Sequence, residues 1–137
     1  MRKTILVVED EVGVRRVLAR LLGDRGFRTI EAGNGREAIQ RLSEETPAAI
    51  IIDLFMPIMS GVELLKALRR SAYYRKIPTV VMTGSGIAEV WGVPTVMKPN
   101  IDGLPSIIEK LLADPGDDGD PDVAPSATGQ ETSSALQ

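Results

Sequence analysis

The chain has 137 residues, of which 43% are hydrophobic and 26% charged, a composition typical of one ordinary globular domain. It contains no cysteine and no histidine, which excludes disulfides, thiolate zinc sites and Ser–His or Cys–His catalysis. The net charge of −3 combines −6 in residues 114–137 with +3 in residues 1–113, and a body this mildly basic does not predict a nucleic-acid binder.

Three short, uninterrupted apolar runs predict strands that are buried on both faces. They are Thr4 to Val8, Ala48 to Ile52 and Thr79 to Met82. Such runs are typical of parallel sheets, because helices cover both faces of the sheet. Two weaker candidates, residues 28–31 and 95–97, bring the expected number of strands to five.

Apolar residues at helical spacing separate these strands and predict four helices. The stripes consist of Val14, Val17, Leu18, Leu21 and Leu22; Ala38, Ile39 and Leu42; Val62, Leu65 and Leu68; and Leu104, Ile107, Ile108, Leu111 and Leu112. We interpret Arg15, Arg16 and Arg20 as the outward side of the first helix. Strands that alternate with helices in this way predict right-handed crossovers and a doubly wound α/β domain.

The two ends of the chain predict a cytoplasmic protein with a disordered tail. Residues 114–137 are rich in Asp, Pro, Gly, Ser and Thr and contain no aromatic residue, so they cannot offset the entropy of ordering. A solvated tail or linker is favoured over a docking peptide. The apolar run near the start is too short for a signal peptide, and none is long enough to span a membrane.

Polar residues follow the predicted strands: Glu9 and Asp10, Asp53, Thr83 and Lys98. In open α/β sheets, ligands bind beyond the carboxyl ends of the strands. Three carboxylates in one cleft repel one another, so at least one pKa is expected to rise unless a cation joins them. Oxygen ligands without His or Cys favour Mg²⁺.

A metal and Lys98 would together attract a phosphoryl group. An aspartate is normally ionised at neutral pH, so Asp53 needs no general base to act as a nucleophile. Taken singly, Asp53, Thr83 or Lys98 is more often a turn residue, a cap or a solvated charge. Glu9 and Asp10 could equally cap the first helix. Their joint occurrence at strand ends favours a site for phosphoryl transfer.

Four segments in this order resemble the receiver domain of two-component response regulators. They are ILVVEDE (residues 5–11), IIDLFMPIMSG (51–61), VVMTG (80–84) and MKP (97–99), within a resemblance that covers about residues 3–113. It implies a flavodoxin-like, five-stranded parallel sheet of order 2-1-3-4-5. Because only the tail follows, we expect a stand-alone regulator, similar to chemotaxis regulators, or a phosphorelay shuttle or phosphate sink.

The resemblance also implies a magnesium-binding phosphoacceptor. Asp53 matches the phosphorylated aspartate, Asp10 the principal metal carboxylate, and Glu9 an assisting one. Phe55 matches the position whose backbone carbonyl is a further metal ligand.

Two further site residues and the partners follow from the same resemblance. Thr83 and Lys98 match the hydroxyl and the amine that contact the phosphoryl group, and the bond from Lys98 to Pro99 is expected to be cis. A sensor histidine kinase or a histidine phosphotransfer protein would be the donor, and the downstream target would be an unknown protein, with no nucleic acid or membrane involved. A role of the first-helix arginines in docking a kinase is the less favoured alternative to a solvated surface.

Two departures from the family concern how the signal leaves Asp53. Only 11 residues, 84–94, lie between Thr83 and the strand predicted at residues 95–97, so the fourth family helix should be stunted or absent, limited to about Ile87–Trp91. Thr95 stands where the family usually has an aromatic residue that reports phosphorylation. Trp91 is a possible substitute, although a simple covering role is favoured.

A third departure concerns the lifetime of the phosphorylated form. Phe55 and Ser85 match positions that tune hydrolysis of the aspartyl phosphate, and a bulky apolar Phe55 is expected to hinder the attacking water.

Two rival functions remain. One is a non-phosphorylated pseudo-receiver scaffold. The other, a phosphatase of the aspartyl-phosphate type, is disfavoured because Phe55 occupies the position of its second aspartate. We therefore expect no enzymatic activity other than autocatalytic phosphorylation and dephosphorylation of the chain itself.

Overall fold

The computed structural model describes residues 2–84, 93–98 and 100–113 of the chain. Its strands are β1 (Thr4–Val8), β2 (Arg28–Ala32), β3 (Ala49–Asp53), β4 (Thr79–Thr83) and β5 (Thr95–Met97). They form one sheet in the order β2-β1-β3-β4-β5, and every pairing is parallel. The predicted sheet order is confirmed, and each strand lies within one residue of its predicted bounds.

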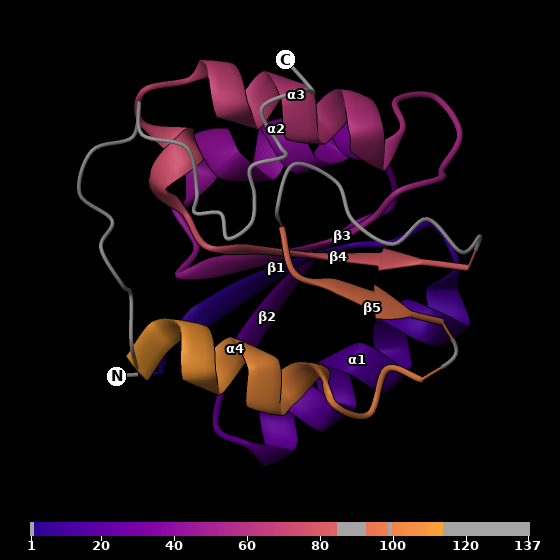
Figure 1. Cartoon of the computed structure of the whole chain (residues 1–137), viewed down its shortest axis with the longest axis vertical. Coiled ribbons are helices and arrows are strands. Elements are labelled where there is room, and N and C mark those ends of the chain that lie inside the picture. The colour runs from indigo at the N-terminus through magenta and orange to yellow at the C-terminus, as the bar shows by residue number, and fades with distance from the viewer. Residues whose placement is uncertain (1, 85–92, 99, 114–137) are drawn as a thin grey trace.

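Helices cover both faces of this sheet. They are α1 (Val12–Asp24), α2 (Gly35–Glu44), α3 (Gly61–Arg70) and α4 (Leu104–Ala113), with the short 3₁₀ helix η1 at Tyr74–Lys76. In Figure 1, α2 and α3 lie on one face of the sheet, whereas α1 and α4 lie on the other. This is the flavodoxin-like, doubly wound arrangement that we predicted.

The hydrophobic core has two halves, one on each face of the sheet. Alternate residues of β1 enter each half: Leu6 and Val8 belong to the cluster under α2 and α3, and Ile5 and Val7 belong to the cluster under α1 and α4. These four side chains are fully buried. Burial contributes about 1.5–3 kcal/mol for each such aliphatic side chain. A strand that supplies both halves needs apolar residues at successive positions, which explains the uninterrupted apolar runs.

The two strands with the weaker patterns are the edges of the sheet. β2 has an exposed first residue and a half-buried middle, and no residue of β5 is fully buried. An edge strand has a neighbour on one side only and less helix above it. Its sequence therefore needs fewer apolar residues than that of a central strand.

Two residues of the predicted apolar stripes are in fact exposed. Val17 of α1 is 49% exposed and Ile39 of α2 is 39% exposed. Each is adjacent in sequence to a buried residue, Leu18 and Ala38, and one position is a rotation of about 100° around a helix. They lie at the margin of their stripes, so each helix forms as predicted although these two side chains are not buried.

Several predicted features lie outside the described residues. They are the short helix around Ile87–Trp91, Ser85, the Lys98–Pro99 bond and the tail from Asp114. Among the helices that the structure describes, none is both long and apolar enough to cross a bilayer.

Candidate functional site

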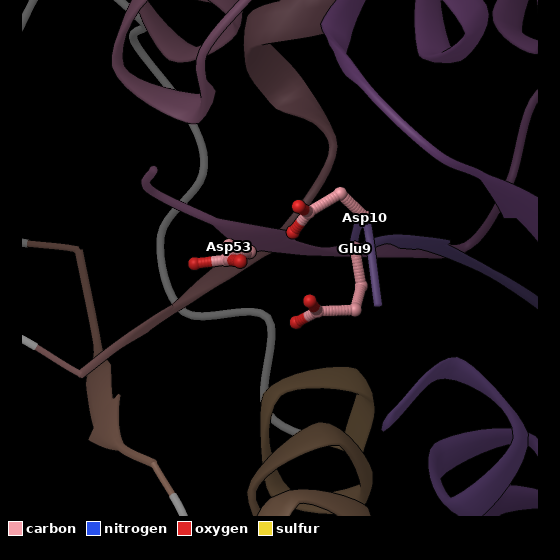
Figure 2. A group of neighbouring side chains, drawn as sticks. All are labelled: Glu9, Asp10 and Asp53. Atoms are coloured by element: carbon pink, nitrogen blue, oxygen red, sulfur yellow. The ribbon is translucent and has the colours of Figure 1, made fainter. Parts of the chain in front are cut away.

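Three carboxylates meet at the carboxyl edge of the sheet. Glu9 and Asp10 follow β1 directly, and Asp53 is the last residue of the neighbouring strand β3. Each carboxylate offers one oxygen, and these oxygens lie within 4.8 Å of one another. Figure 2 shows the side chains of Glu9 and Asp10 extending from the end of β1 toward the side on which Asp53 lies. The expectation that sheet topology gathers these residues is confirmed.

The three acids differ in burial. Glu9 is fully buried and Asp53 is 3% exposed, whereas Asp10 is exposed. Burial, helped by the charge of Asp53, raises the pKa of Glu9 to about 7, although the Glu11 N–H and Lys98 oppose the shift. The predicted rise of one pKa therefore falls on Glu9, the acid with the least access to water.

Lys98 joins two of the carboxylates. It follows β5, and its Nζ lies 3.2 Å from Glu9 Oε1 and 3.3 Å from Asp53 Oδ2. Glu11 Oε1 is 3.7 Å from the same nitrogen. Partial burial favours a lower pKa for Lys98, but the charges and hydrogen bonds of Asp53 and Glu9 outweigh burial and raise it. A charged lysine thus offsets part of the repulsion between the acids.

The remaining predicted site residues lie at the same edge. Thr83 ends β4 and is fully buried, and its carbonyl accepts a hydrogen bond of 2.8 Å from the backbone N–H of Lys98. Phe55 follows β3 by two residues, with its N–H 3.4 Å from Asp53 Oδ1 and 49% of the residue exposed. Thr95 is half-buried, and its hydroxyl donates to the carbonyl of Val93 at 3.0 Å.

The start of α3 packs closely against the backbone of Asp53 and Leu54. Gly61 donates its N–H to the carbonyl of Leu54 at 2.9 Å, and a Cβ at Gly61 would lie 2.0 Å from the Asp53 carbonyl oxygen. Ser60 caps α3 in a reciprocal capping box with Glu63. The glycine of the MPIMSG segment is therefore required, because α3 begins directly against the backbone at the end of β3.

The alternative that Glu9 and Asp10 merely cap the first helix is not supported. α1 begins at Val12, and Glu11 occupies the N-cap position without a side-chain capping bond. The Glu9 carboxylate instead accepts hydrogen bonds from Lys98, at Oε1, and from the backbone N–H of Glu11, at Oε2 with a distance of 3.0 Å.

The outward orientation predicted for Arg15 was wrong. Its side chain is 18% exposed, and the guanidinium bonds the Glu9 carbonyl and the Glu31 carboxylate at 2.7 and 2.9 Å. A signal was present in the sequence, because Leu18 and Leu22 follow Arg15 by three and seven residues and share its helix face.

The donor set fits a magnesium ion. All the side-chain ligands on offer are carboxylate oxygens, and two come from one turn while the third comes from the adjacent strand. Mg²⁺ is typically held by one or two carboxylates while it keeps several waters. The exposed Asp10 leaves the cluster accessible from solvent.

Fold and site together define a doubly wound α/β protein with an acidic, lysine-containing site at its strand ends. The chain belongs to the response regulator receiver domain family, whose model matches residues 5–94.

Relatives and solved structures agree with this assignment. The phosphate regulon transcriptional regulatory protein PhoB of Klebsiella pneumoniae is 38% identical over 89 residues, which are 65% of this chain and 39% of PhoB. Sporulation initiation phosphotransferase F of Bacillus subtilis is 33% identical over 86 residues, 63% of this chain and 68% of that protein. The response regulator TrrA of Thermotoga maritima, in complex with Mg²⁺–BeF, has a TM-score of 0.73 and 29% identity, covering 80% of this chain and 99% of TrrA. The chain spans about two fifths of the length of PhoB.

Proposed function

We propose that this receiver domain accepts a phosphoryl group on Asp53 from a sensor histidine kinase or a histidine phosphotransfer protein, in a reaction that depends on Mg²⁺. The observation that carries the proposal is the convergence of Glu9, Asp10 and Asp53, with oxygens within 4.8 Å of one another beside Lys98. Family membership supports the class of donor. The crystal structure of TrrA in complex with Mg²⁺–BeF supports magnesium as the class of ligand.

Asp53 is the nucleophile in this proposal. A carboxylate oxygen of Asp53 forms a bond to phosphorus while the bond from phosphorus to the donor's imidazole nitrogen breaks, and the electron pair returns to that nitrogen. Lys98, 3.3 Å from Asp53 Oδ2, pairs with an oxygen of the transferred group, and the Thr83 hydroxyl bonds another. These contacts position the group and neutralise its charge, which is most of what phosphoryl transfer needs.

The metal ligands in the proposal are Glu9, Asp10 and Asp53, with the backbone carbonyl of Phe55. Bound Mg²⁺ would supply positive charge against the phosphoryl oxygens. Asp10, which is exposed, is available for direct ligation, whereas buried Glu9 is held by the Glu11 N–H and Lys98.

Signalling then proceeds through protein contacts rather than catalytic turnover. The domain would form and lose its aspartyl phosphate without hydrolysing other phosphate esters, as a shuttle, a sink or a switch for a protein target. We propose that this exchange takes place in the cytoplasm.

Incubation with acetyl phosphate and Mg²⁺, followed by intact-mass measurement, tests the proposal. The wild type should gain one phosphoryl group, and both Asp53→Asn and wild type in excess EDTA should not. Asp24→Asn, which neutralises an exposed aspartate at the end of α1, is the matched control and should gain the group normally. Absence of any gain in a folded wild type would instead favour the scaffold.

A further inference from the structure

The guanidinium of Arg15 links two elements beside the acidic cluster. Arg15 lies in the first turn of α1, and its Nη1 donates to the backbone carbonyl of Glu9 at 2.7 Å. Its Nε donates to Oε1 of Glu31, on β2, at 2.9 Å. With 18% of its side chain exposed, Arg15 is held far more closely than a solvated arginine.

Arg15 completes the fixation of the Glu9 backbone. The N–H of Glu9 donates to the carbonyl of Ala32 at 3.0 Å, and the Glu9 carbonyl accepts from Arg15. That carbonyl belongs to the peptide unit joining Glu9 to Asp10, and a peptide unit is planar. Fixing the carbonyl therefore fixes the plane from which the Asp10 side chain departs.

This fixation matters because the carboxylates of the cluster repel one another. Asp10 is exposed, so a free turn would let its carboxylate swing toward solvent and away from Glu9 and Asp53. The free energy needed to return the Asp10 carboxylate to the cluster would then oppose metal binding. A turn that is already ordered avoids this cost.

We propose that Arg15 is a positioning residue of the magnesium site, which holds the turn that carries Glu9 and Asp10. The inference rests on the proposed function, because it concerns the same metal site. It also makes a prediction whose sign differs from that of a charge effect. Removing a cation beside three carboxylates should tighten Mg²⁺ binding if charge alone matters. It should weaken binding if Arg15 orders the turn.

Calorimetric Mg²⁺ titrations of unphosphorylated protein separate these two accounts. Arg15→Met should weaken Mg²⁺ binding roughly tenfold, the size expected for one charge-assisted hydrogen bond. Arg15→Lys keeps the charge but lacks a guanidinium that can donate through both Nε and Nη1. It should therefore also bind Mg²⁺ more weakly than wild type. Arg16→Met removes the neighbouring, exposed arginine and is the matched control, with binding unchanged or slightly tighter.

Two further readouts distinguish positioning from a general loss of structure. In metal-free Arg15→Met, amide hydrogen exchange at Asp10 and Glu11 should accelerate, while exchange in β3 and β4 stays at the wild-type rate. With acetyl phosphate, the Mg²⁺ concentration for half-maximal phosphorylation should rise, and the rate at saturating Mg²⁺ should not change.

Equal or tighter Mg²⁺ binding by both Arg15 variants would overturn the inference. If Arg15→Met does not fold, Arg15→Lys decides the matter by the same titration. If the wild type itself binds no Mg²⁺, the proposed function fails as well. A wild type that binds Mg²⁺ and is phosphorylated, beside Arg15 variants that match it, removes only the role of Arg15.

Discussion

Phe55 places a large apolar side chain two residues after the proposed phosphoacceptor. Its N–H lies 3.4 Å from Asp53 Oδ1, so the backbone of Phe55 lies at the edge of the site. If its ring restricts the approach of water to the aspartyl phosphate, Phe55→Asn should shorten the lifetime of the phosphorylated form. We expect roughly a fivefold faster decay, equivalent to about 1 kcal/mol of activation free energy. Phosphate release from purified phosphoprotein measures this rate.

Ile58 offers a control for Phe55 within the same loop. It is 74% exposed and has φ 69°, a left-handed conformation that is unusual for a β-branched residue but tolerated by Asn. Ile58→Asn likewise replaces a large apolar side chain with asparagine, farther along the loop, and should leave the decay rate as in wild type. A decay in Phe55→Asn that is equal to or slower than wild type would contradict the proposed shielding.

At the scale of elements, the start of α3 is locked against the end of β3. A Cβ on Gly61 would lie 2.0 Å from the Asp53 carbonyl oxygen and 2.7 Å from Leu54 Cα. Both are backbone atoms that cannot move without shifting the strand end. Gly61→Ala should therefore lower the free energy of unfolding by about 2 kcal/mol or more, measured by urea denaturation. It should also slow phosphorylation by acetyl phosphate, because Asp53 is displaced.

Gly23 provides the matched glycine substitution. It lies in α1 with nothing within 4 Å of its would-be Cβ. Gly23→Ala should raise the free energy of unfolding by about 0.5 kcal/mol, since alanine has the higher helix propensity. Similar destabilisation in both variants would argue against the close approach of α3 to Asp53.

Elements with a simple burial pattern could be predicted from the sequence. Features that depend on contacts with distant segments of the chain could not. β1 and β3 were evident because strands buried on both faces must be apolar throughout. Sheet topology then placed the acids together. The burial that selects Glu9 for the raised pKa, and the contact of Arg15 with Glu31 on β2, depend on segments distant in sequence. No local pattern encodes either one.

At the scale of the whole molecule, the buried acid at the site couples folding to pH. The pKa of Glu9 is about 7 in the metal-free fold against 4.5 as its ordinary value, mainly because of burial. Between these two pH values the folded state keeps a proton that the unfolded state has released. The resulting contribution to stability is complete below about pH 4.5 and is lost as the pH rises through about 7.

Urea denaturation of the metal-free protein between pH 5 and 8 measures this coupling when wild type is compared with Glu9→Gln. The two proteins differ only at this residue, so the difference between their curves reports Glu9 and its interactions with Asp53 and Lys98. A neutral glutamine can still accept the Glu11 N–H. The variant should lie closest to the wild type near pH 5 and exceed it most near pH 8, by at most about 1.4 kcal/mol for each unit of pKa shift. Saturating Mg²⁺ should reverse the order at high pH, because the ion binds the ionised carboxylate and stabilises only the wild type strongly. Parallel stability curves without metal would show that Glu9 is ionised in the fold throughout this range, and that the Glu11 N–H and Lys98 together offset its burial.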